Sequence, residues 1–156
     1  MVMEVMNEKE KSEEELLDEI AARAEVLNEH ATAMVTHINQ LDRELVAAGV
    51  GTPVRVIKTV HGLDLKTLRR HFHTAERVAL EFSKREGTWR IRVQALPCDR
   101  GEENVLCLYQ FPFDGTPRDI KFLAYDLHRS LLKKALKTLN DQVTPELADE
   151  LELIEE

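Results

Sequence analysis

Apolar residues recur at alternating steps of three and four from residue 17 to residue 45, with no proline or glycine between them. This is the spacing of a helix face that contacts a partner along its whole length. Ser12 and Glu15 have capping-box spacing and predict where the helix begins. Gly49, Gly51 and Pro53 predict where it ends. We call this series the apolar seam, and its members are Leu17, Ile20, Ala24, Leu27, Ala31, Met34, Ile38, Leu41 and Leu45.

The predicted helix, residues 13–48, is long for its own domain. At 1.5 Å per residue it spans about 50 Å, whereas a compact chain of 156 residues has a diameter of roughly 40 Å. Either the helix kinks, or part of the seam contacts something else, for which a second copy is the simplest choice. Leu16, Ala21, Val35 and Val46 widen the apolar stripe. A wide stripe suits a bundle or packing on a sheet better than a two-stranded coiled coil.

The middle of the chain has the pattern of strands. Residues 54–60 are rich in β-branched side chains, and residues 63–72 have helical spacing. Residues 75–84 fit both a helix and a strand. We choose a strand because "SKREGT" resembles a hairpin turn and the residues after it, from Trp89 to Ala95, alternate cleanly. The stretch "NVLCLYQFPF" is predicted as a further strand.

One last major helix is predicted to begin at Thr116, as its N-cap, and Pro117. Its inner face consists of Ile120, Leu123, Leu127, Leu131 and Ala135. The order of elements predicts an α+β fold. It has a long N-terminal helix, a central antiparallel meander of about four strands, and a C-terminal helix packed on the sheet.

The length is typical of one domain. We predict a single α+β domain at residues 13–141, after a disordered or frayed acidic lead at 1–12. Residues 142–156 are predicted as an acidic segment that is a short helix or mobile. No apolar run is long enough to span a membrane, and the acidic start does not resemble a signal peptide. Cys98 and Cys107 are expected to remain reduced, with Cys107 buried in a strand, so we expect a cytoplasmic protein.

The net charge of -8 is unevenly distributed, because residues 55–92 carry ten basic and four acidic side chains. The interpretation we favour is that basic strands face acidic helices within one fold. The alternative is a site for phosphate or nucleic acid. The low pI of about 5.3 and the absence of a nucleic-acid-binding motif weigh against it. The candidate anion-binding residues are Arg69, Arg70, Arg77, Arg90 and Arg92.

Two groups of histidines have the spacing of metal ligands. His30, Met34 and His37 share a helix face, but no carboxylate completes the set, so we interpret both histidines as flanks of the seam. In "RRHFH", an extended backbone would place His71 and His73 on one face. His61 is then a possible third ligand. A solvated basic turn is the interpretation we favour, and we expect no metal or other cofactor.

No set of residues in the sequence has the pattern of a known catalytic site. Glycine-rich phosphate loops, G-x-S-x-G and H-E-x-x-H are all absent. We therefore predict a non-enzymatic protein-interaction module, of the adaptor, chaperone or inhibitor type, that forms a homodimer through its long helix and binds a protein partner. The alternatives are a nucleic-acid- or anion-binding regulator that uses residues 55–92, and a metal-dependent enzyme that uses His61, His71 and His73.

Overall fold

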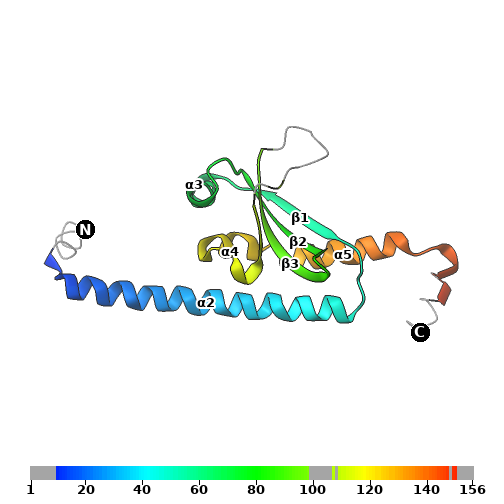
Figure 1. The fold of residues 1–156 in the computed structure, drawn as a ribbon, viewed down its shortest axis with the longest axis horizontal. Coiled ribbons are helices and arrows are strands. Elements are labelled where there is room, and N and C mark those ends of the chain that lie inside the picture. Colours follow the sequence, from blue (N-terminus) through cyan, green and yellow to red (C-terminus); the bar gives the residue numbers. More distant parts are fainter. Residues whose placement is uncertain (1–9, 99–106, 108, 148, 151–156) are drawn as a thin grey trace.

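A computed structural model describes residues 10–98, 107, 109–147 and 149–150, and it has the predicted α+β architecture (Figure 1). A long helix lies along one side of a sheet, and shorter helices pack near it. The elements in chain order are α2 (Glu13–Ala47), β1 (Val54–Thr59), α3 (Gly62–His71), β2 (Arg77–Arg85), β3 (Thr88–Leu96), β4 (Tyr109–Pro112), the 3-10 turn η1 (Phe113–Gly115), α4 (Arg118–Tyr125) and α5 (His128–Gln142).

The sheet is an antiparallel meander in the order β1-β2-β3-β4, as predicted. Most of the ambiguous stretch 75–84 lies in β2, Arg77–Arg85, so the choice of a strand is confirmed. The turn to β3 consists of Glu86 and Gly87, with φ of 52° and 84°. Two central residues with positive φ make a type I′ turn, whose twist matches that of the two strands. Local turn chemistry therefore resolved the ambiguity correctly.

One face of the sheet carries the core. Cross-strand partners lie on the same face, and Val54, Phe82 and Ile91 form one such row, in which all three are buried. These side chains join one hydrophobic cluster with residues from α2, α4 and α5, such as Ile38 and Leu131. The opposite face is polar and carries all five arginines of the strands. The alternation of the sequence thus assigns the two faces correctly.

The single C-terminal helix predicted from Thr116 onward is wrong, because the chain breaks into α4 and α5 between Tyr125 and His128. No proline or glycine lies at the break. It arises from tertiary packing, since α4 contacts α2 and α3 whereas α5 packs mainly on β1. The N-cap is Pro117 rather than Thr116, whose hydroxyl donates instead to the Pro112 carbonyl at 3.0 Å.

Cys107 is exposed and precedes β4, so its predicted burial in a strand is wrong. Of the predicted N-terminal lead, residues 1–9 lie outside the described residues. In the acidic C-terminal segment, residues 145–147 and 149–150 are helical. Thr144 Oγ1 accepts a hydrogen bond from the Leu147 amide at 3.3 Å, as expected of a residue at a helix start. The division into lead, domain and C-terminal segment stays a prediction.

Candidate interaction surface

Helix α2 begins and ends within one residue of the predicted limits. Ser12 Oγ accepts a hydrogen bond from the Glu15 amide at 3.2 Å and satisfies one of the unpaired donors of the first turn. At the other end, Gly49 has φ of 72° and the Val50 amide donates to the Leu45 carbonyl. This is a Schellman motif, and the burial of Val50 fixes the turn that leads to β1.

The apolar seam divides at Ala31, the first buried residue of α2. We call residues 31–47 the docked half and residues 13–30 the free arm. In the docked half, Ile38 is fully buried and Leu41 is buried, and both belong to the core cluster. The docked half contacts β3, η1 and α4. This part of the seam is covered by the chain itself.

Two polar contacts fix the docked half in place. His37 Nδ1 lies 2.5 Å from the Tyr125 hydroxyl, at the end of α4. Asp42 Oδ1 accepts a hydrogen bond from the Ile91 amide at 2.6 Å. Ile91 lies one residue beyond the part of β3 that pairs with β4. The Asp42 carboxylate therefore serves as the acceptor for a backbone amide that has no partner strand at the sheet edge.

The Asp42 carboxyl is partly buried, and this burial raises its pKa to about 6 from an ordinary value of 3.8. The hydrogen bond from Ile91 opposes the shift, as do the nearby charges of Arg90 and Arg92. Desolvation of the charged form outweighs all three.

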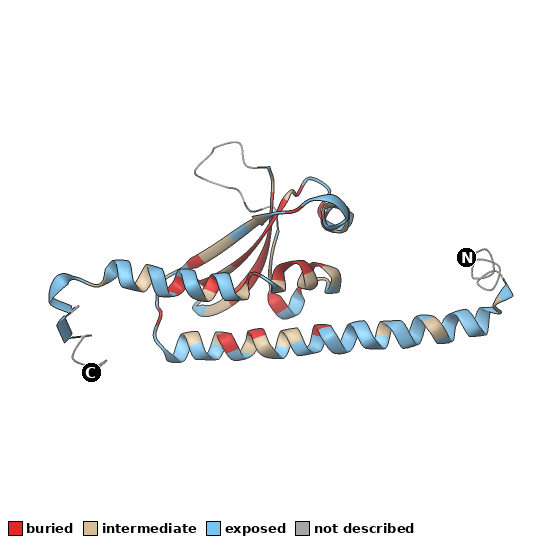
Figure 2. Cartoon of the chain, turned by 180° about the vertical axis from the view of Figure 1, so that it is seen from behind, coloured by how far each residue is buried: buried red, intermediate tan, exposed pale blue. Residues whose placement is uncertain are grey.

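The free arm leaves the rest of the seam uncovered and projects past the body of the protein (Figures 1 and 2). Leu17, Ile20 and Leu27 are 63%, 62% and 40% exposed. Val26 is 53% exposed on the same helix but lies outside the seam. The seam residues have an unbroken continuation into the core, whereas Val26 has none. An apolar row of this kind marks an interaction surface more than a single exposed side chain does.

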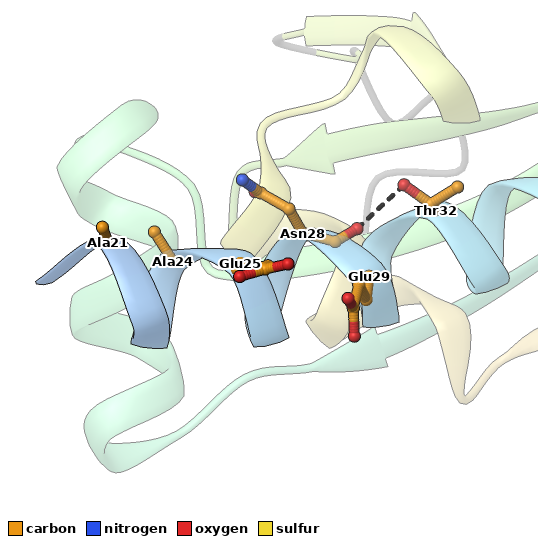
Figure 3. A pocket seen from close by; sticks show the side chains of 6 residues that line it. All are labelled: Ala21, Ala24, Glu25, Asn28, Glu29 and Thr32. Carbon is orange, nitrogen blue, oxygen red and sulfur yellow. Dashed lines mark hydrogen bonds between the residues drawn. The ribbon is translucent and has the colours of Figure 1, made fainter. Parts of the chain in front are cut away.

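An open groove follows the free arm on the flank of the seam (Figure 3). Its volume is about 550 Å³, and all the residues that line it belong to α2: Ala21, Ala24, Glu25, Asn28, Glu29 and Thr32. A second hollow of about 310 Å³ continues it to α4, where Arg118 and Lys121 join Asn28. Arg118 Nη1 donates to Asn28 Oδ1 at 2.9 Å. The small side chains of the arm leave room there for another helix to approach closely.

The charge of the free arm is strongly acidic, with Arg23 its only lysine or arginine. The acids concentrate at the tip and on the side away from the seam. The first turn carries three of them, which is favourable near the positive end of the helix dipole. The acidic residues of the arm are Glu13, Glu14, Glu15, Asp18, Glu19, Glu25 and Glu29.

The first histidine group is divided by the boundary between arm and docked half. His30 is exposed on the arm, Met34 is half-buried, and His37 contacts Tyr125. The interpretation of His37 as a flank of the seam agrees with this position. Among the described residues, no group of three or more histidine, cysteine, aspartate or glutamate side chains is arranged to hold a metal ion.

The basic turn is not extended, so His71 and His73 do not form the strand pair on which the metal alternative depended. His71 is the last residue of α3, and its Nε2 lies 2.8 Å from Asp119 Oδ1 of α4. His73 is exposed, and His61 is the N-cap of α3. The contact from His71 to Asp119 holds α3 against α4 instead.

The candidate anion-binding arginines lie at two separate places. Arg69 and Arg70 are on α3, where Arg69 pairs with Glu76 at 3.0 Å. The other three share the polar face of the sheet, as the strand pattern predicted. There, Arg77 and Arg92 are buried and donate to the carbonyls of Pro97 and Ser83, at 2.9 Å and 2.6 Å, and Arg90 pairs with Asp114 at 2.8 Å.

The sequence did not reveal the residues that hold α2 on the body of the protein and so determine where the exposed part of the seam begins. Asp42, Tyr125 and Arg118 act on residues far away along the chain, and no local pattern marks them. Two arginines of the polar sheet face, Arg55 and Arg85, were missed although strand alternation places them beside the others.

No family model, curated protein or solved structure compared with this chain matches it. Within the part of the chain that the structure describes, no helix is both long and apolar enough to cross a membrane.

Proposed function

We propose that this chain is a non-enzymatic protein-interaction module that self-associates through the free arm of α2. One observation carries the proposal: the seam that packs the docked half into the core continues without interruption onto the arm, where Leu17 and Ile20 are more than half exposed. Burying such side chains yields roughly 1.5–3 kcal/mol each. An adaptor, chaperone or inhibitor of this kind leaves the sheet and α5 available to a further protein.

The arm has the properties of a preformed binding element. It is part of one continuous helix with the docked half, so binding does not have to nucleate it. Ala21 and Ala24 line the side of its groove next to the seam and allow close approach of a second helix there, while Glu25 and Glu29 line the outer side. Little conformational entropy is then lost on association, which favours binding.

The test is the mass of the full chain in solution, measured by light scattering across a range of concentrations. We expect a mass twice that of the 17.9-kDa chain for the wild type. Ile20→Glu places a charge in the seam and is expected to give a monomer. Val26→Glu is the matched control, because Val26 is exposed to a similar extent on the same helix but outside the seam.

A dimer for Val26→Glu and a monomer for Ile20→Glu supports the proposal. A wild type that stays monomeric at every concentration overturns it, as does an Ile20→Glu variant that remains a dimer.

Polyanion binding is the second candidate, and the polar face of the sheet favours it. The register places five arginines there, at positions 55, 77, 85, 90 and 92, with Glu81 as the only acidic residue among the described residues of that face. Phosphate contacts need such a cluster. With Arg77 and Arg92 buried, Arg55 and Arg85 are the arginines we expect to reach a ligand, together with Arg90.

Retention on heparin tests the second candidate. Salt-dependent retention that falls in an Arg55→Ala/Arg85→Ala variant, and persists in Arg69→Ala/Arg70→Ala, assigns binding to the sheet face. The reverse pattern assigns it to α3. Absence of retention at low salt removes the candidate.

A further inference from the structure

We infer that two copies pair their free arms antiparallel, so that the tip of each arm lies against α4 of the other copy. The inference rests on the proposed function, and it adds the orientation of the two copies, the register of their helices and a second contact surface. Three features of the described residues support the same arrangement: the length of the arm, the order of its side chains and the placement of its charges.

The length of the arm gives a first estimate of the register. The helix begins at Glu13, and the seam becomes buried at Ala31. Two arms that overlap over their whole free length place Glu13 of one copy opposite Ala31 of the other. In this register the two bodies lie at opposite ends of the helix pair, because each body begins where the other arm ends. Neither docked half has to open.

The side chains fit this register. With Glu13 opposite Ala31, Leu17 lies opposite Leu27 of the second copy, and Ile20 lies opposite Ala24. The uncovered seam residues therefore pair only with one another, and each Ile20 meets a small alanine. Large residues opposite small ones let two helices approach closely without leaving a void.

The charges complement each other in this arrangement. The first turn of one arm, Glu13 to Glu15, lies beside Asn28 of the other copy, where Arg118 and Lys121 line the second hollow. Asp114 lines the same hollow, but its carboxylate is paired with Arg90 at 2.8 Å. Glu14 lies on the same flank of the helix as Asn28, whereas Glu15 points away from the seam. Opposite charges at the edge of an interface favour the correct register and suppress others.

A parallel arrangement has the reverse properties. It places the two acidic first turns side by side and aligns the two helix dipoles in the same direction. It also brings both bodies to the same end of the helix pair. There, the seam of each docked half is already occupied by its own α4 and β3. Antiparallel pairing avoids all three conflicts.

Disulfide trapping in the full chain tests the orientation. Cys98 and Cys107 are exposed, so both are first changed to serine. An Ala21→Cys chain should then form a disulfide-linked dimer with itself, since the two copies of that position are offset by only about 3 Å along the axis. A Leu17→Cys chain should not, because its own copies are offset by about 15 Å. Leu17→Cys mixed with a Leu27→Cys chain of different mass should cross-link.

The outcomes separate this inference from the proposed function. A dimer in which Leu17→Cys cross-links with itself is parallel, and it removes the inference while self-association stands. A dimer that none of these cysteines traps pairs through another register and also overturns the inference. A chain that is monomeric before any cysteine is introduced overturns both.

Charge exchange tests the contact between the arm tip and α4. Glu14→Arg should raise the dissociation constant several-fold, and the added Arg118→Glu change should restore most of the loss. Glu15→Arg is the matched control and should change the dissociation constant less, because this side chain faces away from the seam. Equal effects of the two arginine substitutions, without rescue, would overturn the placement of the tip.

Discussion

The free arm and the docked half of α2 have the same apolar spacing and opposite surroundings. Ile38 and Ile20 both lie in the seam, yet Ile38 is fully buried in the core while Ile20 is 62% exposed. The difference comes from α4, η1 and β3, which contact α2 and bury its seam only from Ala31 onward. Apolar periodicity therefore identifies the face of a helix that will be buried. Which residues bury it depends on the tertiary packing of the rest of the chain.

The free arm remains helical without tertiary cover for local reasons. Ser12 caps it, and the Lys11 ammonium lies 2.8 Å from the Glu19 carboxylate. The docked half also supplies the helix nucleus, which is the costly step for an isolated helix. The two halves thus depend on different interactions, and substitutions should separate them.

The largest difference in the free energy of unfolding should be between variants of the two isoleucines, Ile38 and Ile20. Ile38→Ala removes a fully buried side chain and should lower the free energy of unfolding by about 2–5 kcal/mol. Ile20→Ala should change it by no more than about 0.5 kcal/mol in the monomer. Chemical denaturation of both variants at high dilution, where the chains are monomeric, measures the difference. Equal losses would mean that the arm packs on its own body.

The next effect tests the polar anchor of the docked half. Asp42→Ala leaves the amide of Ile91, a fully buried residue, without its acceptor, which should cost about 1–3 kcal/mol. The measurement is denaturation at pH 5, where the carboxyl is mostly neutral and its charge does not obscure the hydrogen bond. Asp18→Ala, on the exposed arm, is the control and should be close to neutral.

The cap of the free arm should give a smaller and local effect. Ser12→Ala removes the acceptor of the Glu15 amide and should destabilise the first turns by about 1 kcal/mol. We expect faster amide exchange near the start of the arm and no change in the unfolding midpoint of the body. A shift of that midpoint comparable to the Asp42→Ala shift would show that arm and body unfold as one unit.

The smallest effect is a pH dependence of the docked half. The pKa of Asp42 is raised in the folded state to about 6 from 3.8, so folding favours its protonated form. Stability from this group is therefore present at low pH and is lost as pH rises through about 6. Asp42→Asn does not titrate, so its advantage in Tm over the wild type should be largest at pH 7.5 and shrink at pH 5.

The carboxyl is only partly buried, and solvent screening limits the change in that advantage to about 2 °C. Thermal unfolding of both proteins at the two pH values checks it. An advantage that grows on acidification would contradict the direction of the pKa shift.

Local patterns were sufficient for most of the fold. The limits of α2, the meander and the Glu86–Gly87 turn follow from spacing, caps and turn residues, which act within a few positions. The break between α4 and α5 was missed because no residue there disfavours a helix, and only packing against different partners separates them. Burial of Arg77 and Arg92 was missed for a related reason: alternation gives the face of a side chain, not its surroundings.

The sequence was sufficient to predict which residues form the seam, but not how much of the seam remains exposed. All nine seam residues follow from the sequence, but the boundary at Ala31 depends on contacts with distant elements. Asp42 bonds to a residue 49 positions away, and His37 contacts one 88 positions away. Sequence spacing carries no information about pairs so far apart.

Those separations also matter while the chain is being synthesised. The residues that cover the docked half, from Ile91 to Tyr125, follow α2 in the chain. At roughly 5–20 residues per second, the 88 positions between His37 and Tyr125 take on the order of ten seconds to translate. During that interval the whole seam, docked half included, emerges from the ribosome without its intramolecular cover. Neighbouring nascent chains on one message would then present to each other a longer apolar face than the finished protein does.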